Sequence, residues 1–364
     1  MIRLSHLFPL IALLMLVACG ERSKKNLPPA TGLTGDMYLI MDSLQWEGPL
    51  GDVLDSLFRQ EAEVLPRKER IFHVRWIDPR KLNFVLKGRR NLVYAVTLDQ
   101  RTSGAAYLRG LFTPESIAQI KTDSALFVQT QEDVYARHQS VMFLFAKTEA
   151  ELIQKVRQNG AQLTAYFDRT ERVRQTQALY KAGELKGVNQ WVQKNYGCSF
   201  RVPFGYQLVM SKSDFLWARQ INPRDDKNVF IARTPYRSEK QFSRDSLIAF
   251  RNAVCRQYLF EDPDVPDSYL ITEMNAPGKP VNVKPITFHN EYAVELRGLW
   301  RANNFSMGGP FQAIAVVDRS SNYLYYLEGF VFSPERDQRE LMRELETILY
   351  SFRPGPVAAA SAGQ

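Results

Sequence analysis

Hydrophobic and polar residues alternate with two different periods in the first part of the chain, which predicts strands and helices in turn. Short apolar runs at 37–41, 71–77 and 91–98 have the length of strands. A helix is predicted at 49–60, because apolar residues recur there at the spacing of one helix face: Leu50, Val53, Leu54, Leu57 and Phe58.

A second helix is predicted after Asp78-Pro79, where a capping carboxylate precedes a proline that has no N–H to leave unpaired. We expect it to end at Gly88, with its apolar side chains facing inward: Leu82, Val85 and Leu86. These strands and helices together predict a β-α-β-α-β unit.

A further helical region follows the apolar strand predicted at 141–145. Thr148 and Glu151 form a capping box, which begins a helix that we expect to end at Asn159-Gly160. Residues 161–197 continue with a charged, helical pattern, which predicts a connector between two halves of the chain.

The second half is richer in strand signals than the first. Helices are predicted at 243–259 and from Ser333-Pro334 onward. The strand at 292–300 alternates apolar and charged residues, which is typical of one buried and one wet face. The other predicted strands are 199–202, 207–210, 215–221, 229–233, 269–274, 281–288, 311–318 and 323–332.

These elements predict an α+β chain with two α/β sandwich-like domains, the second a largely antiparallel sheet with two helices. The expected parts are a domain at 36–160, the connector at 161–197, a domain at 198–353 and a disordered tail at 354–364. Residues 108–112 resemble 296–300, but 94–98 matches 292–296 in an incompatible register. Duplication of one ancestral half and its absence both stay open.

The N-terminus has the pattern of a bacterial lipoprotein signal. Arg3 precedes an apolar run at 7–17, and Leu16-Val17-Ala18-Cys19 follows. The run is shorter than the roughly 20 residues that cross a bilayer, which favours a cleaved signal at 1–18 over a membrane span. Cys19 then becomes the lipidated first residue and 19–35 a tether. The alternative is an ordinary apolar helix with an incidental cysteine.

Composition and charge narrow the class of protein and its partners. A hydrophobic content of 45% and an aromatic content of 12% are those of a globular chain. The formal net charge of +8 becomes +7 when Arg3 is removed with the signal. A basic cytosolic chain would suggest nucleic acid, but the signal places this chain outside the cytosol. Anionic headgroups, glycans, acidic proteins or plain solvent are the expected counterparts.

Residues that carry chemistry are few. The mature chain has three separate histidines, His73, His138 and His289, so no metal site and no cofactor are predicted. Cys198 and Cys255 either form a disulfide in an oxidising compartment or remain two buried thiols. The acidic run at 261–267 is interpreted as a solvated loop. A carboxylate pair of the glycosidase type stays open, because any two close acidic residues would provide it.

One segment has the composition of a recognition loop. Residues 297–311 join two predicted strands and combine aromatic, arginine and asparagine side chains, which binding surfaces tend to use. The alternative is a long hairpin whose aromatic side chains pack back onto the core. The candidate binding residues are Arg297, Trp300, Arg301, Asn303, Asn304, Phe305 and Met307.

Several runs resemble the domain-of-unknown-function family 4837: residues 41–51, 78–82, 297–300, 307–311 and 345–350. The likeness extends over nearly the whole mature chain. This family consists of uncharacterised lipoproteins of the Bacteroidota, so the resemblance implies a Gram-negative envelope and transfers no activity. The elements from Cys198 onward are also weakly similar to the PsbP-like fold of extrinsic photosystem subunits, which are binding and assembly proteins.

We therefore expect a lipid-anchored protein of the cell envelope, at the outer membrane and facing the periplasm, because residues 20–25 are mostly basic rather than acidic. The expected role is non-catalytic binding or assembly, with an envelope protein or a glycan as partner and no nucleic acid. The alternative is an envelope hydrolase that uses a carboxylate pair.

Overall fold

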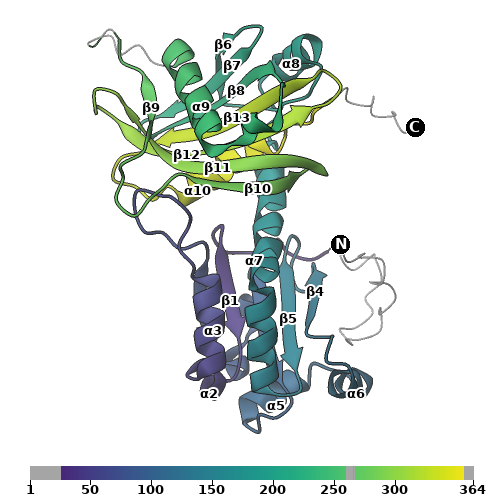
Figure 1. Ribbon diagram of the computed structural model, residues 1–364. Helices are drawn as coiled ribbons and strands as arrows, with labels where there is room; N and C mark the ends of the chain where they lie inside the picture. Colours follow the sequence, from purple (N-terminus) through teal and green to yellow (C-terminus); the bar gives the residue numbers. More distant parts are fainter. Residues whose placement is uncertain (1–25, 260–264, 266, 356–364) are drawn as a thin grey trace. The chain divides into compact units, whose positions relative to one another are not determined.

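The computed structural model describes residues 26–259, 265 and 267–355, which fold into two compact units (Figure 1). Unit 1 extends to Gln60 and resumes at Arg70–Glu171. Unit 2 consists of Glu61–Glu69 and the chain from Arg172 onward. The predicted signal, Cys19, most of the acidic run and the end of the predicted tail lie outside the described residues.

Unit 1 is built on a mixed sheet with the strand order β2-β1-β3-β5-β4. All pairs among the first four strands in this order are parallel, and β4 is an antiparallel edge. The strands are β1 (Asp36–Ile40), β2 (His73–Ile77), β3 (Asn91–Thr97), β4 (Val128–Glu132) and β5 (Ser140–Ala146). The β-α-β-α-β prediction is thereby confirmed for β1, β2 and β3.

Helices cover both faces of this sheet, as a buried parallel sheet requires. Side chains of α3 (Pro49–Phe58) and α7 (Glu149–Leu179) pack on one face with Val93 and Leu144. Leu108 of α5 (Ser103–Arg109) and Ile120 of α6 (Pro114–Thr122) pack on the other. Alternate residues of β3 and β5 point to opposite faces, so both strands are buried throughout. A short helix, α2 (Ser43–Trp46), precedes α3.

The helix predicted after Asp78 is broken in two. A 3-10 turn covers Pro79–Lys81 and α4 covers only Phe84–Lys87. The backbone of Leu82 is extended between them, with a ψ angle of 103°. Asn83 then caps the second piece, because its side chain accepts the N–H of Leu86. The prediction that Val85 faces inward was wrong, since 61% of this residue is exposed.

The helix expected to end at Asn159-Gly160 continues to Leu179, and the division between the units falls within it. Neither residue acts as a cap. The Asn159 side chain donates to the carbonyl of Lys155, one turn earlier, at 2.9 Å. A Cβ atom at position 160 would lie 2.8 Å from Cδ1 of Leu57, so the glycine serves close packing of α7 on α3 rather than helix termination.

The predicted tether is shorter than 19–35, because residues from Pro28 onward pair with unit 1. The Arg137 N–H donates to the Pro28 carbonyl at 2.8 Å, and the Ala30 N–H donates to the Arg137 carbonyl at 2.9 Å. The Thr31 N–H donates to the carbonyl of Gly88 at 2.9 Å. These bonds fix the backbone well before Gly35.

Unit 2 contains an antiparallel sheet with the strand order β10-β11-β12-β13-β8-β7-β6, and β9 pairs with the end of β11. This confirms the α+β class and the largely antiparallel second sheet. The strands are β6 (Gln207–Ser211), β7 (Phe215–Asn222), β8 (Asp225–Pro235), β9 (Leu270–Glu273), β10 (Asn282–Phe288), β11 (Glu291–Ala302), β12 (Gly308–Asp318) and β13 (Tyr323–Phe332). The strand predicted at 199–202 is reduced to a single bridge between Ser199 and Arg353.

Helices also cover both faces of this sheet. α8 (Val188–Tyr196) and α10 (Arg339–Leu349) pack on the face that carries Leu216 and Ile231. α9 (Arg244–Tyr258) packs on the face that carries Phe215 and Phe230. The prediction that one face of the strand at 292–300 is exposed to solvent was therefore wrong at the centre of the strand. Glu295 is 3% exposed and binds Lys284 at 3.0 Å, Arg297 at 3.0 Å and Gln312 at 2.7 Å.

The 61–69 segment belongs to unit 2 although its flanking residues belong to unit 1. Its last residue, Glu69, is 9% exposed and accepts the backbone N–H groups of Gln338 and Arg339, each at 2.8 Å. These are orphan donors at the start of α10, where Gln338 itself supplies no side-chain cap. The helix expected from Ser333 thus begins later, at Arg339.

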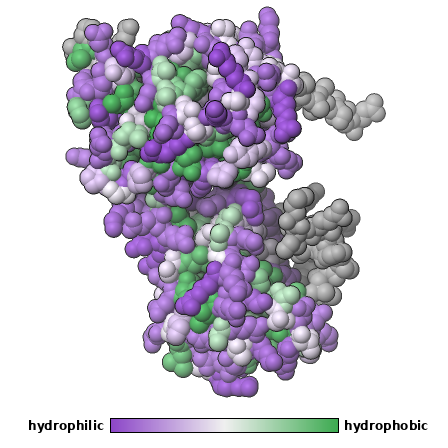
Figure 2. Space-filling model, in the orientation of Figure 1, coloured by the Kyte–Doolittle hydropathy of each residue, from purple (hydrophilic) through white to green (hydrophobic). Residues whose placement is uncertain are grey.

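Hydrophilic residues cover most of the face of each unit that Figure 2 shows, with small hydrophobic patches between them. Within the described part of the chain, no helix has the length and apolar character that a membrane span needs.

Candidate functional site

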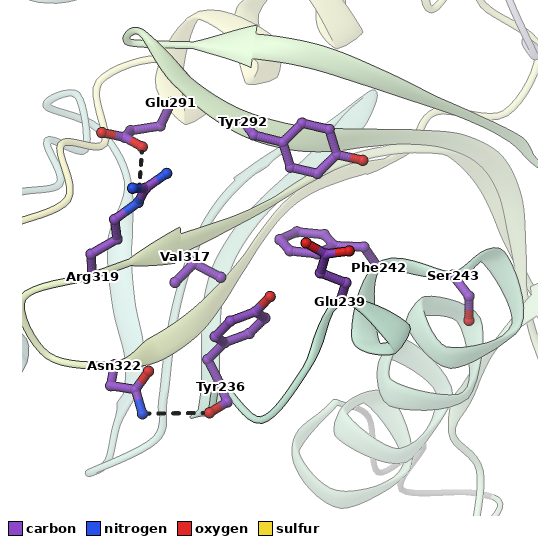
Figure 3. A pocket seen from close by; sticks show the side chains of 9 residues that line it. All are labelled: Tyr236, Glu239, Phe242, Ser243, Glu291, Tyr292, Val317, Arg319 and Asn322. Atoms are coloured by element: carbon purple, nitrogen blue, oxygen red, sulfur yellow. Dashed lines mark hydrogen bonds and ion pairs between the residues drawn. The ribbon is translucent and has the colours of Figure 1, made fainter.

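A hollow of about 800 Å³ opens on unit 2, where β8, β11 and β12 meet the start of α9 (Figure 3). This volume falls within the range of small-molecule sites, roughly 300–1,000 Å³. We call this feature the aromatic hollow. Its lining residues are Tyr236, Glu239, Phe242, Ser243, Glu291, Tyr292, Val317, Arg319 and Asn322.

Three aromatic rings form the apolar part of the hollow. Phe242 lies between two tyrosines, with ring centroids 6.1 Å from Tyr236 and 5.4 Å from Tyr292. The Phe242 and Tyr292 rings are nearly perpendicular, at 86°. Tyr292 is 57% exposed, so its ring is supported from one side and open to solvent on the other.

Local backbone bonds hold Phe242 in this place. A 3-10 turn at Glu239–Phe242 is fixed by a capping box between Ser238 and Gln241. The Gln241 side chain accepts the N–H of Arg237 at 2.6 Å and that of Ser238 at 3.2 Å. Ser243 then caps α9 by accepting the Ser246 N–H at 3.3 Å. Phe242 is the residue before this cap, a position where apolar side chains commonly fix the entry of a helix.

Polar groups lie around the rings. Arg319 forms an ion pair with Glu291 at 3.6 Å, and the Asn322 amide donates to the backbone carbonyl of Tyr236 at 3.5 Å (Figure 3). Glu239 also lines the hollow with its carboxylate (Figure 3). Among the described residues, neither a histidine nor a cysteine lines the hollow. Glu239 and Glu291 are its two carboxylates, and Glu291 is already held by Arg319.

The recognition loop predicted from the sequence is shorter than 297–311. β11 extends to Ala302 and β12 begins at Gly308, so only residues 303–307 connect them. Arg297 lies within β11, bound to Glu295 at 3.0 Å and to Glu346 at 3.5 Å. Trp300 is 2% exposed and donates its ring N–H to the carbonyl of Val331 at 3.3 Å. Met307 packs against the core on the α9 face.

The remaining candidates lie in or beside the short loop. Arg301 pairs with Glu273 at 2.7 Å, and its guanidinium lies 4.1 Å from the ring centre of Phe305. Phe305 is 74% exposed and has a left-handed φ of 62°. Asn303 holds the backbone of Tyr269, and the Asn304 side chain accepts the N–H of Ser306. This loop and the aromatic hollow lie at opposite ends of the β11–β12 hairpin.

Cys198 and Cys255 are both free and buried. Cys198 packs with Leu216 and Ile231, whereas Cys255 packs with Phe215 and Phe230. Neighbouring residues of a strand point to opposite sides, so the two thiols lie on opposite faces of the sheet and are not bonded to each other. Burial raises the pKa of each thiol to about 12.

The carboxyl ends of the parallel strands in unit 1 are a second place where open sheets bind ligands. Here the acidic side chains bind within the unit instead. Asp42 accepts hydrogen bonds from Thr102 and from the N–H of Leu44. Hydrogen bonding to Arg80 lowers the pKa of Asp78, and Asp99 accepts a backbone N–H at the start of α7 at 3.0 Å. This polar network stabilises the loops that follow the strands.

A charge pair lies deep in unit 2. Arg251 of α9 and Glu328 of β13 are both 0% exposed and share bonds of 2.8 and 2.9 Å. Thr272 accepts a further Arg251 N–H at 3.2 Å, and Tyr326 donates its hydroxyl to Glu328 at 2.8 Å. Because every group is satisfied internally, the pair is structural. Across the described ranges no cluster of three or more His, Cys, Asp or Glu side chains could hold a metal ion.

The described residues thus form an α+β protein of two units. Residues 186–351 match the family model described as Domain of unknown function (DUF4837). Residues 30–180 match a different family model, Domain of unknown function (DUF8532). The resemblance is confirmed, but the expected extent was wrong: the similar runs at 41–51 and 78–82 lie in the segment of the second family. A comparison with curated proteins gives no match.

The sequence did not predict the hollow, because Tyr236, Phe242 and Tyr292 come from three separate segments of the chain. Each residue taken alone is an ordinary core aromatic. The one local signal was Phe242, which directly precedes the serine cap of a predicted helix.

Proposed function

We propose that the protein is a lipid-anchored lipoprotein of a Gram-negative cell envelope that acts as a non-catalytic binding component. The proposed location is the outer membrane, with the folded part of the chain in the periplasm. It rests on the signal that ends at Cys19 and on the basic residues that follow. An acyl anchor, such as palmitate on Cys19, would supply the membrane attachment that the described helices do not.

The aromatic hollow is the observation that supports binding. It combines open aromatic surface with a few polar groups, which is the usual make-up of a recognition site. The Ser243 hydroxyl in its lining already accepts the Ser246 N–H as a helix cap and donates to the Ser246 hydroxyl at 2.8 Å. A catalytic hydroxyl is instead hydrogen-bonded to a general base.

A hydrolase remains the second candidate, because Glu239 and Glu291 both line the hollow. A pair of carboxylates is the usual catalytic set for glycoside hydrolysis. The ion pair between Glu291 and Arg319 disfavours a free base or nucleophile at that position. Turnover of any envelope polymer by the wild type that is lost in Glu239→Gln would favour the hydrolase over the binding protein.

The lipid anchor and the membrane location are tested by labelling cells with an alkyne analogue of palmitate and separating their membranes. The wild type should carry the label and sediment with the outer membrane. Cys19→Ala should lose the label, whereas Cys198→Ala, a matched cysteine change within the folded body, should keep it. An unlabelled wild type would refute the anchor.

The binding role is tested with photo-crosslinking side chains in intact cells. A crosslinker at Tyr292 should capture a discrete adduct, and one at Phe84, an exposed aromatic residue of unit 1, serves as control. A crosslinker at Phe305 asks whether the short loop shares the role. Equal, diffuse labelling from all three positions would contradict a binding site at the hollow.

A further inference from the structure

We propose that the aromatic hollow binds an uncharged saccharide. This inference rests on the proposed binding function and names the ligand class of the same site. Three observations carry it: the arrangement of the rings, the polar groups at their edge and the balance of charge.

The rings present the kind of surface that sugars bind. A pyranose ring has a flat C–H face that stacks on an aromatic ring, and hydroxyl groups around its rim. Tyr292 offers such a face, because more than half of the residue is exposed while Phe242 supports it from the side at 5.4 Å. Tyrosine suits this use, since its ring is apolar and its hydroxyl stays wet.

Hydrogen-bonding groups of both kinds surround this face. Glu239 supplies carboxylate oxygens as acceptors, and the Asn322 amide supplies both a donor and an acceptor. The Asn322 bond to the Tyr236 carbonyl is long, at 3.5 Å, so little is lost when the amide turns to a ligand. Sugar hydroxyl groups donate and accept, and therefore match a mixed rim better than a purely apolar ligand does.

The charge of the lining argues against an anionic ligand. Two carboxylates, Glu239 and Glu291, stand against one guanidinium, Arg319. The guanidinium is already paired with Glu291 at 3.6 Å. A phosphate, an acidic lipid headgroup or a uronic acid would meet a net negative lining, and like charges repel at these distances.

The ring geometry also argues against a quaternary ammonium ligand. Such cations are held in cages whose rings stand apart around the charge. Here Phe242 is close to both tyrosines, at 5.4 and 6.1 Å between centroids. The rings therefore pack directly against one another and leave no space for a cation between Phe242 and either tyrosine, while the exposed Tyr292 ring remains available to a flat sugar ring.

The test uses the full chain, purified in a detergent that has no sugar headgroup and applied to a glycan array with neutral, amino, sulfated and uronic glycans. We expect retention on neutral glycans that is insensitive to salt. The best neutral trisaccharide on the array is then titrated by calorimetry.

Three variants assign the binding to the hollow. Tyr292→Ala should weaken the titrated affinity about tenfold, which corresponds to the loss of one well-placed aromatic contact. Tyr292→Trp should retain it, because the stacking face remains. Phe84→Ala removes an exposed aromatic residue of unit 1 and should change nothing.

Four outcomes would overturn the proposal. On the array, these are that no neutral glycan is retained, or that only charged glycans bind and salt releases them. In solution, these are that tetramethylammonium rather than sugar shifts the tyrosine NMR resonances, or that Tyr292→Ala binds the sugar as tightly as the wild type does. None of these outcomes affects membrane labelling at Cys19 or a protein adduct captured from Tyr292. Failure of the saccharide inference and failure of the proposed function are thus distinguishable.

Discussion

Glu69 caps the helix α10 from a distant part of the sequence, by accepting the N–H of Gln338 on one carboxylate oxygen and that of Arg339 on the other. A carboxylate at this place also lies favourably in the field of the helix dipole. The 61–69 segment is therefore an integral part of unit 2.

Glu69→Ala should lower the free energy of unfolding of unit 2 by about 1–3 kcal/mol, because two buried backbone donors lose a charged acceptor. Glu69→Gln keeps one acceptor oxygen, so its free energy of unfolding should lie between those of Glu69→Ala and the wild type. Urea unfolding measures both. Glu63→Ala, which removes a half-exposed partner of Lys284 at 3.4 Å, is the matched control and should change stability by less than about 0.5 kcal/mol. Equal losses in Glu63→Ala and Glu69→Ala would contradict the capping role.

Arg251→Met should destabilise unit 2 strongly, by about 3–5 kcal/mol, because it leaves the Glu328 carboxylate buried without its cation. The double variant Arg251→Met with Glu328→Gln should recover more than half of this loss, since no uncompensated charge remains and the new amide oxygen can still accept the Tyr326 hydroxyl. A double-mutant cycle by urea unfolding gives the coupling. Additive losses would mean that the two side chains do not act as a pair.

His289 should make unit 2 less stable in mild acid. Burial, and then the adjacent Arg353 guanidinium, lower the pKa of His289 to about 4, against about 6.5 in an unfolded chain. Between these values the unfolded state binds more protons, so stability falls as pH drops from about 6.5 to 4 and is unaffected above. The ring is partly solvated, so solvent screening reduces the size of the effect.

His289→Asn removes this titration and retains a residue that tolerates the left-handed φ of 52° at this position. The fall in the urea midpoint between pH 7 and pH 4.5 should therefore be smaller in this variant than in the wild type. His138→Asn is the matched control, because His138 is exposed and has a similar φ of 62°. An identical pH dependence in all three proteins would exclude His289 as the cause.

The two buried thiols should be inert in the folded protein. In a Cys19→Ala background, Cys198 and Cys255 should not react with a thiol reagent at neutral pH, because the thiolate is the reactive form and burial raises both pKa values to about 12. After unfolding without reductant, both should react at once. Failure to react in the unfolded state would reveal a disulfide, which contradicts the placement of the thiols on opposite faces.

The sequence predicted those elements whose pattern and packing agree. The apolar face of α3 and the strands β3, β5 and β13 are examples, because the local pattern of apolar residues was enough to predict each element. Predictions failed where tertiary contacts gave a residue another role. Gly160 looks like a helix terminator but provides room for Leu57, and Glu295 looks like a solvent-facing residue but is neutralised in the interior by Lys284 and Arg297.

The candidate site was less predictable than the fold. Trp300 was predicted to bind because it lies in a segment rich in aromatic, arginine and asparagine residues, yet its ring is buried and its N–H donates to the carbonyl of Val331. The residues of the hollow come together only because β8, β11 and the start of α9 meet in space. The spacing of residues along the sequence does not predict which distant segments will line one hollow.

The chain passes between the two units after Gln60, again after Glu69 and finally after Glu171. The segment matched by DUF8532 therefore contains the cap of a helix that lies in the segment matched by DUF4837. A fragment cut at the family boundaries, residues 186–351, would therefore keep α10 but lose Glu69, and the first turn of α10 would be left without its cap. Residues 61–69, although part of the first family segment, thus belong to the same compact unit as the second family segment.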